Sequence, residues 1–452
     1  MNIAIVGAGV GGHSLAKQFS SEGHRVSVVD RDRNKVKSLG EKLDVLAVHG
    51  NAGMPSVLAR AGVREAQMVI AVTDVDEVNL VVGMVARRMG VEHTIVRLRN
   101  QEYVADSSVL PLNELGIEHV INPDPAIVDT LVRTIAVPGT FHVATLSDGQ
   151  HVILGVTVPQ DSPSAGLTMA QLREIGSQEA FLVLDIIRED RVIVPKGNDT
   201  LEPGDTVHIL ASTDTVQLVP PILYGQPQIV DVVIIAGATR IGIQLGEALQ
   251  DRVERVVLVE PDPGAAEEAA SVLPRVNVLL GEPTDLDVLE EASLERCDLF
   301  CAVTEDDQLN TMSALLARRH SETYAAVLVH EPDYVPVLHS LGMQLVINPR
   351  LATVGEILRY VRQGHIQSVT RLAHGYAEIL EMEVPDGSPA VRAPLKALRF
   401  PQNALLGAIV HDGVMRIPTG ESHIQPGDTV VVFALPDAIG SIEKLFSRRR
   451  WF

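Results

Sequence analysis

Three segments of this 452-residue chain occur twice, in the same order, at long spacing. The matching pairs are AVTDVDEVN at 71–79 with AVTEDDQLN at 302–310, VINP at 120–123 with VINP at 346–349, and LEPGDTV at 201–207 with IQPGDTV at 424–430. A fixed order at this spacing indicates one duplicated unit rather than a short-period solenoid. Each half must therefore form the same fold.

The first part of each unit alternates apolar strand patterns with amphipathic helix patterns. In the first copy we expect strands at 3–6, 26–29, 45–48, 68–72 and 94–98, and helices at 11–21, 33–42, 56–61 and 76–89. This alternation predicts a Rossmann-like α/β domain, a doubly wound parallel sheet with helices on both faces.

The second part of each unit predicts a small α+β domain, because it contains short alternating strands such as 152–158, 181–188 and 207–211. A segment with three prolines and a glycine reads as a linker between the units. The expected order is a first Rossmann-like domain (1–122), a connecting helix (123–140), a first small domain (141–219), the linker (220–228), a second Rossmann-like domain (229–348), a connecting helix (349–366) and a second small domain (367–452).

A glycine-rich turn follows the first predicted strand and opens a helix. Gly7, Gly9 and Gly12 fill the G-x-G-x-x-G frame: a tight turn, room for a pyrophosphate at the backbone, and close packing of helix on strand. The helix N-terminus adds N–H groups and a positive dipole end. The ligand is expected along the whole turn, at Gly7, Ala8, Gly9, Val10, Gly11 and Gly12.

Asp30 ends the second predicted strand, about 20 residues further on, where an acidic side chain accepts hydrogen bonds from ribose hydroxyls. Its charge disfavours a 2′-phosphate, so NAD(H) or an adenine nucleotide is favoured over NADP(H). The adjacent Arg31 keeps NADP(H) open as an alternative.

Polar residues also follow the third and fourth predicted strands, whose carboxyl ends face the same edge of the sheet. Asn51, beside Ala52, is placed to bond an adenine edge, or else it belongs to a plain turn. Thr73 and Asp74 lie near the ligand, and Asp74 with Glu77 also fits a capping box for the next helix.

Arg97 and Arg99 end the fifth predicted strand and share a face, because they are two residues apart. A pair of guanidinium groups suits bidentate contact with terminal phosphates. The alternative is surface ion pairing.

These motifs, in this order, resemble RCK (KTN) nucleotide-binding domains, and the Pro-Gly-Asp segments resemble the small RCK C-terminal domain. Two such pairs in one chain resemble the TrkA-type regulatory subunits of bacterial Trk potassium uptake systems, over essentially the whole length. The resemblance implies nucleotide contacts at Gly7, Gly9, Gly12, Asp30, Asn51, Thr73, Arg97 and Arg99. The family usually has Asp at the position of Asn51, so the adenine-loop contact is expected to differ.

The resemblance also implies a regulatory function. Such proteins form a homo-oligomeric ring, a dimer or tetramer, in the cytoplasm and peripheral to the cell membrane. The ring lies beneath a TrkH- or TrkG-type potassium-translocating subunit, and NAD(H), ATP or ADP changes its shape and gates potassium flow.

The second copy departs from the nucleotide-site pattern. Thr239 occupies the place of the middle glycine, where a β-branched side chain obstructs a pyrophosphate, although Glu260 matches Asp30 as a ribose ligand. Glu282, Leu328 and His330 replace Asn51, Arg97 and Arg99. We therefore expect the first site to be the main one and the second to bind weakly or to serve as scaffold, with Arg240 as partial compensation.

Other classes of function lack support in the sequence. The net charge of −21 disfavours nucleic acid, no apolar run approaches the roughly 20 residues that span a bilayer, and zinc, P-loop and serine-hydrolase motifs are missing, so we expect neither a metal site nor catalysis. An NAD-dependent oxidoreductase and a nucleotide-sensing scaffold of another transporter are the alternatives. Cys297 and Cys301 are expected to be buried apolar residues rather than a redox pair, and the basic-aromatic tail 447–452 is a candidate membrane contact.

Overall fold

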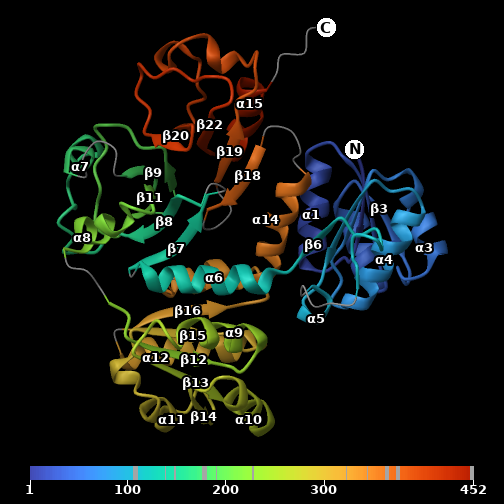
Figure 1. Cartoon of the computed structure of the whole chain (residues 1–452), viewed down its shortest axis with the longest axis horizontal. Coiled ribbons are helices and arrows are strands. Elements are labelled where there is room, and N and C mark those ends of the chain that lie inside the picture. Colours follow the sequence, from blue (N-terminus) through green and yellow to red (C-terminus); the bar gives the residue numbers. More distant parts are fainter. Residues whose placement is uncertain are drawn as a thin grey trace. The chain divides into compact units, whose positions relative to one another are not determined.

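The computed structural model of the chain divides into two compact units (Figure 1). Unit 1 contains Met1–Ile127, His330–Pro332 and Asn348–Ile357, and unit 2 contains Val128–Val329, Asp333–Ile347 and Leu358–Phe452. The structure describes residues 1–104, 110–137, 139–146, 149–175, 181–189, 191–225, 229–321, 323–343, 345–361, 366–372 and 377–447. Residues 448–452, the main part of the candidate membrane tail, lie outside these ranges, and no described helix is both long and apolar enough to cross a membrane.

The sheet of unit 1 has six parallel strands in the order β3-β2-β1-β4-β5-β6, so the predicted Rossmann-like class is confirmed. Its strands are β1 (Asn2–Val6), β2 (Arg25–Asp30), β3 (Leu46–His49), β4 (Met68–Ala71), β5 (His93–Arg97) and β6 (His119–Ile121). Its helices are α1 (Val10–Ser21), α2 (Arg33–Lys42), α3 (Pro55–Arg60), α4 (Asp76–Arg88) and α5 (Gln101–Val104). The strand order reverses between β1 and β4, which both carry almost wholly buried apolar residues.

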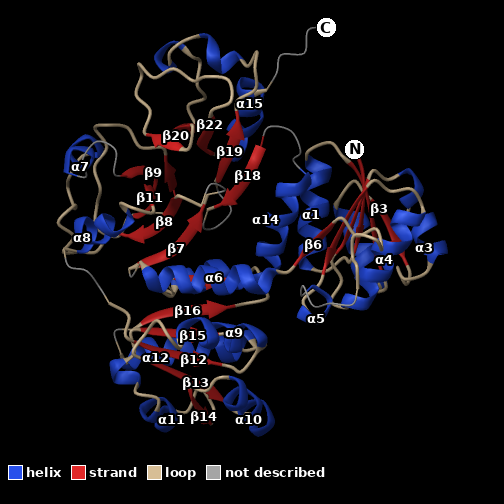
Figure 2. Cartoon of the chain, in the orientation of Figure 1, coloured by secondary structure: helices blue, strands red, loops and turns tan. Residues whose placement is uncertain are grey.

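Unit 2 contains a second six-stranded parallel sheet in the equivalent order, β14-β13-β12-β15-β16-β17, which confirms the duplication (Figure 2). Its strands are β12 (Val232–Ala236), β13 (Arg255–Glu260), β14 (Asn277–Leu280), β15 (Leu299–Ala302), β16 (Tyr324–Leu328) and β17 (Leu345–Ile347), and its helices are α9 (Arg240–Leu249), α10 (Pro263–Val272), α11 (Leu286–Glu291), α12 (Asp307–His320) and α13 (Tyr334–Ser340). Cys297 and Cys301 are buried free thiols, as expected, and burial raises the pKa of Cys297 to about 11, so it remains an unreactive thiol at neutral pH.

The two small domains of unit 2 each form a five-stranded antiparallel sheet. The first has β7 (Thr140–Thr145), β8 (His151–Thr157), β9 (Phe181–Arg188), β10 (Arg191–Ile193), β11 (Thr206–Ser212), α7 (Met169–Ile175) and α8 (Val219–Tyr224). The second has β18 (Ile366–Arg371), β19 (Glu378–Glu383), β20 (Ala404–His411), β21 (Val414–Arg416), β22 (Thr429–Ala434) and α15 (Pro436–Phe446). One face of each sheet contributes to a shared core that includes Leu184, Leu210, Ile379 and Phe433. Helices α6 (Pro123–Ala136) and α14 (Pro349–Val361) lead into the small domains.

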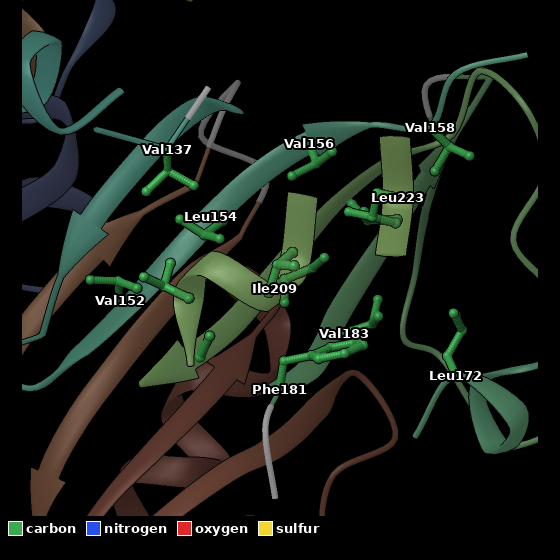
Figure 3. Packing of buried hydrophobic residues seen from close by; sticks show 14 of the residues in the cluster. Val137, Val152, Leu154, Val156, Val158, Leu172, Phe181, Val183, Ile209 and Leu223 are labelled. Atoms are coloured by element: carbon green, nitrogen blue, oxygen red, sulfur yellow. The ribbon is translucent and has the colours of Figure 1, made fainter. Parts of the chain in front are cut away.

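The predicted linker at 220–228 is wrong for its first part, because Val219–Tyr224 form helix α8. Proline is tolerated in the first turn of a helix, where its missing N–H has no intrahelical partner, and Gly225 ends the helix at φ 77°. Leu223 is only 2 % exposed and packs with Leu154 and Ile209 in the core of the first small domain (Figure 3). Residues 226–228 lie outside the described ranges.

Shortening the buried side chain of α8 should destabilise the first small domain. Because Leu223 is buried, Leu223→Ala should lower the free energy of unfolding by about 2–5 kcal/mol. Leu218, just before the helix, is 52 % exposed, and Leu218→Ala should change it by under about 0.5 kcal/mol. Urea unfolding of the two variants measures both values, and equal effects would contradict the docking of α8.

The repeated Pro-Gly-Asp segment is a tight turn closed by its aspartate. Gly204 and Gly427 both have φ 87°, and the buried Asp205 and Asp428 accept hydrogen bonds from the backbone N–H groups three residues earlier. Arg188 binds Asp205 in a bidentate manner, with two N–O distances of 2.7 Å. In the second copy a histidine takes this place: His411 Nδ1 lies 2.6 Å from Asp428 Oδ1.

The exchange of arginine for histidine predicts a pH-dependent stability. The hydrogen bond to Asp428 and the charge of Asp412 raise the pKa of His411, so its protonated form stabilises the folded state. His411→Gln should therefore destabilise the protein most below about pH 6.5, the unfolded-state pKa, and the effect should fade as the pH rises through the raised folded-state pKa. Arg188→Gln is the matched control, since arginine stays charged throughout. Urea unfolding between pH 5.5 and 9 tests this, and parallel pH profiles for the two variants would refute it.

Candidate nucleotide-binding site

The glycine turn lies at the carboxyl end of β1, at the point where the strand order reverses. Gly7 has φ 109°, and its N–H donates to the Val29 carbonyl at 2.8 Å. A Cβ atom on Gly12 would overlap the Gly7 carbonyl oxygen, so only glycine lets α1 pack this closely on the turn. A Cβ atom on Gly9, the N-cap of α1, would meet nothing within 4 Å. The middle glycine therefore faces open space beside the unpaired N–H groups of the first turn of α1.

Asp30 holds the glycine turn from the end of β2. Its Oδ2 accepts from the Ala8 N–H at 2.5 Å, and its Oδ1 accepts from the Asp32 N–H at 2.8 Å. A carboxylate has about four lone-pair sites, so both oxygens keep capacity for ribose hydroxyls. The neighbouring Arg31 has an exposed side chain, and His49 Nε2 lies 3.1 Å from its carbonyl oxygen.

Asn51 forms the plain turn that was the alternative to an adenine contact. Its Oδ1 accepts from the Gly53 N–H at 2.9 Å, which is an Asx turn. Ala52 is buried in the core of the first sheet, so a contact of its side chain with a ligand is not supported. A contact between Asn51 and adenine stays a prediction.

A buried asparagine joins the ends of β4 and β5. Asn79 Oδ1 accepts from the Thr73 N–H and hydroxyl at 3.0 and 2.7 Å, and its Nδ2 donates to the carbonyl oxygens of Thr73 and Arg97. Asn310 makes the same four bonds in the second copy, to Thr304 and the Leu328 carbonyl. The sequence shows only that this asparagine is repeated in both copies. Its hydrogen bonds between the ends of two strands are seen only in the tertiary structure.

The capping box expected for Asp74 and Glu77 is wrong. The N-cap of α4 is Val75, which has no side chain that can accept a hydrogen bond, and Asp74 instead pairs with Arg97 at 2.9 Å. Although partial desolvation favours the neutral acid, the hydrogen bond and charge of Arg97, with further charge from Arg350 and Lys35, lower the pKa of Asp74. The carboxylate is thus ionised at neutral pH.

Arg97 and Arg99 are held by different partners. Arg97 is 8 % exposed, its Nη2 donates to Thr73 O and Asp74 Oδ1, and its buried Nε has no hydrogen-bond partner among the described residues. Arg99 Nε lies 3.8 Å from Asp124 Oδ1. Both side chains are therefore ion-paired, although Arg97 is buried rather than at the surface as the alternative held, and the phosphate clamp stays a prediction.

Asp76 is a residue of this edge that the sequence did not single out. Its Oδ2 accepts from the Arg99 and Asn100 N–H groups at 2.9 and 2.8 Å and so fixes the segment after β5. No sequence signal marks it, because its partners lie far along the chain.

Thr239 changes the equivalent turn of the second copy. Its Oγ1 accepts from the Gly242 N–H at 3.2 Å and donates to the Val303 carbonyl at 2.8 Å, so it caps α9. Gly9 has no side chain and leaves the matching N–H, that of Gly12, without such a cap. The side chain thus takes up a backbone donor that has no side-chain cap in the first copy.

The second copy repeats the hydrogen bonds of Asp30 but differs in charge at the positions of Asn51 and Arg97. Glu260 repeats the role of Asp30: Oε2 accepts from the Ala238 N–H at 2.7 Å and Oε1 from the Asp262 N–H at 2.9 Å. Glu282 is exposed at the position of Asn51, and Leu328 is buried at the position of Arg97.

The residues of the first copy fit a nucleotide. The open glycine, the free donors of α1, the spare lone pairs of Asp30 and the orphaned Arg97 Nε offer partners for phosphate and ribose. When bound, a nucleotide would supply the diphosphate and ribose that these groups recognise.

The two glycines at the start of α1 should respond differently to a methyl group. Gly12→Ala forces α1 away from Gly7 and should cost about 3 kcal/mol of stability, whereas Gly9→Ala should cost less than about 1 kcal/mol. Chemical unfolding of both variants tests the packing, and a fully stable Gly12→Ala protein would show that the observed approach is not required.

Comparisons with known proteins match the order of the domains. Residues 3–123 and 233–349 match the TrkA-N domain, and residues 153–223 and 379–447 match the TrkA-C domain. The Trk system potassium uptake protein TrkA of Azorhizobium caulinodans is 33 % identical over 452 residues, which cover 99 % of this chain and 98 % of that protein. The protein of the same name from Haemophilus influenzae is 30 % identical over 463 residues, which cover 100 % of both chains.

Solved structures share the fold over nearly the whole chain. The GsuK RCK domain has a TM-score of 0.62 at 17 % identity and covers 98 % of this chain and 94 % of its own. The GsuK channel bound to NAD has a TM-score of 0.62 at 16 % identity, covering 98 % of this chain and 78 % of its own. With TrkA-N and TrkA-C domains in tandem and full-length relatives at about a third identity, the chain belongs to the TrkA family of Trk system potassium uptake proteins.

Proposed function

We propose that this chain is the nucleotide-binding regulatory subunit of a Trk-type potassium uptake system. The observation that carries the proposal is the open glycine turn at the switch point, with Gly9 facing free space and Asp30 beside it. Membership of the TrkA family supplies the biological setting, and GsuK, which has the same fold, has been solved with NAD and with ADP. NAD(H), ATP and ADP are the ligands that we propose.

Regulation would work through a shift between conformations of an assembled ring. A nucleotide changes such an equilibrium only if it binds one conformation better than the other. We propose that copies of this chain assemble as a dimer or tetramer at the cytoplasmic face of the membrane, and that a TrkH- or TrkG-type subunit supplies the potassium pathway.

We propose binding rather than catalysis at this edge. Three polar side chains of this edge hold backbone: Asp30 binds Ala8, Asn79 binds Thr73, and Asp76 binds Arg99. A dehydrogenase would need a general acid beside the nicotinamide. Steady NADH oxidation by the pure protein would favour that alternative.

We further propose that the two copies differ in affinity. In the second, the Thr239 hydroxyl takes up the Gly242 N–H, and Leu328 replaces a cation. The first copy then senses the nucleotide and the second serves mainly as scaffold.

Exchanging the middle residues tests this difference. Gly9→Thr should cap α1 as Thr239 caps α9 and lower the affinity of the full chain for ADP and NADH at least about tenfold, because it removes a phosphate donor and adds bulk. Thr239→Gly should leave the stronger site unchanged. Titration calorimetry measures both. Full affinity in Gly9→Thr with loss in Thr239→Gly would reverse the assignment of the two sites.

The coupling to transport has its own test. Potassium flux through the reconstituted membrane subunit should change on addition of ADP or NADH when the wild-type chain is present, and should not change with Gly9→Thr. A flux that is indifferent to nucleotide, with a wild-type chain that binds it, would favour a sensing scaffold of another transporter.

A further inference from the structure

The two copies carry opposite charges at one repeated position. The segment Asn-Pro is followed by Asp124 in the first copy and by Arg350 in the second. Arg350 lies at the start of α14, within Asn348–Ile357, and this segment belongs to unit 1 together with the first nucleotide domain. A cation from the second half of the sequence is therefore part of the compact unit that holds the first site.

The backbone of Arg350 is fixed against the glycine turn. Asn348 Oδ1 accepts from the N–H groups of Arg350 and Leu351, both at 3.0 Å, and so caps α14. The carbonyl oxygen of Arg350 lies 3.8 Å from the place where a Cβ atom of Gly11 would stand. Gly11 is in the first turn of α1, whose N–H groups are the expected phosphate donors.

The guanidinium of Arg350 is held by the segment that follows β16. Its Nη1 donates to the His330 carbonyl at 3.0 Å, which uses one of its five N–H groups. Partial desolvation raises the pKa of Asp74, which follows β4, while the hydrogen bond and charge of Arg97 lower it. The charge of Arg350 lowers this pKa further, by a smaller effect than Arg97. His330 matches Arg99 in the repeat, and it also lies in unit 1.

We propose that Arg350 binds the terminal phosphate of a nucleotide held in the first site, so that the second half of the chain completes this site. The inference rests on the proposed function, since it assigns a further ligand of the same nucleotide. A planar guanidinium suits bidentate contact with a terminal phosphate. The backbone of Arg350 lies beside Gly11, in the first turn of the helix that provides the expected phosphate donors. Arg350 would thus favour ATP and ADP over AMP.

This position also gives the ligand a mechanical role. Helix α14 begins in unit 1, and its residues from Leu358 onward belong to unit 2. A phosphate that binds Arg350 acts on the first turn of a helix that continues into the other unit. The number of phosphates on the nucleotide is then sensed at the first turn of helix α14, whose residues belong to both units.

The experiment compares AMP, ADP and ATP on the full chain by titration calorimetry. Arg350→Gln should lower the affinity for ATP and ADP about tenfold and leave that for AMP within about twofold, because only the longer ligands reach the guanidinium. Arg350→Lys should recover part of the loss. Arg64→Gln is the matched control, since Arg64 is an exposed arginine of unit 1 that precedes β4, at the opposite edge of the sheet.

The outcomes separate the inference from the function on which it rests. A wild-type chain that binds none of the three nucleotides overturns the proposed function. Binding that Gly9→Thr abolishes, with an ATP-to-AMP preference that Arg350→Gln retains, overturns the inference alone. An equal loss for all three nucleotides in Arg350→Gln would assign Arg350 a structural role and also overturns it.

Discussion

The close approach of α1 to the glycine turn is the contact on which the site depends. A side chain at Gly12 would overlap the Gly7 carbonyl, and the same overlap would occur between Gly242 and Gly237 in the second copy. This packing aims the first turn of the helix at the switch point in both copies. The close packing of helix on turn is a requirement of the fold. The second copy keeps it, although Thr239 replaces the middle glycine there.

Duplication separates residues that hold the fold from residues that would hold a ligand. Asn79 and Asn310 make the same four bonds, and Asp30 and Glu260 both hold their glycine turns, so these side chains have a structural role in each half. The middle position of the turn differs, as Gly9 is open and Thr239 caps its helix. Positions that differ between the copies while the backbone stays the same are those where nucleotide recognition is expected to act.

Much of the fold was predictable because its signals are local. Strand and helix periodicity located the first five strands and four helices of unit 1 to within one residue, but it did not predict β6 (His119–Ile121). The glycine frame predicted the turn between β1 and α1. The predictions that were wrong depended on competition between partners. Pro220 and Pro221 suggested a linker, but the burial of Leu223 stabilises a helix there. Asp74 fitted a capping box, but Arg97 binds it.

The sequence by itself determined the duplicated architecture and the order of the domains, because the repeated segments keep their order along the chain. It also determined the glycine frame and the acidic residue that ends β2, because these depend on local spacing. Only the tertiary structure decided that Asp76 holds the segment after β5, that Arg97 and Arg99 have separate partners, and that Arg350 belongs with the first nucleotide domain. These are contacts between residues far apart in sequence. Periodicity and spacing carry no information about such contacts, because which side chains meet is set by how the packed elements bring them together.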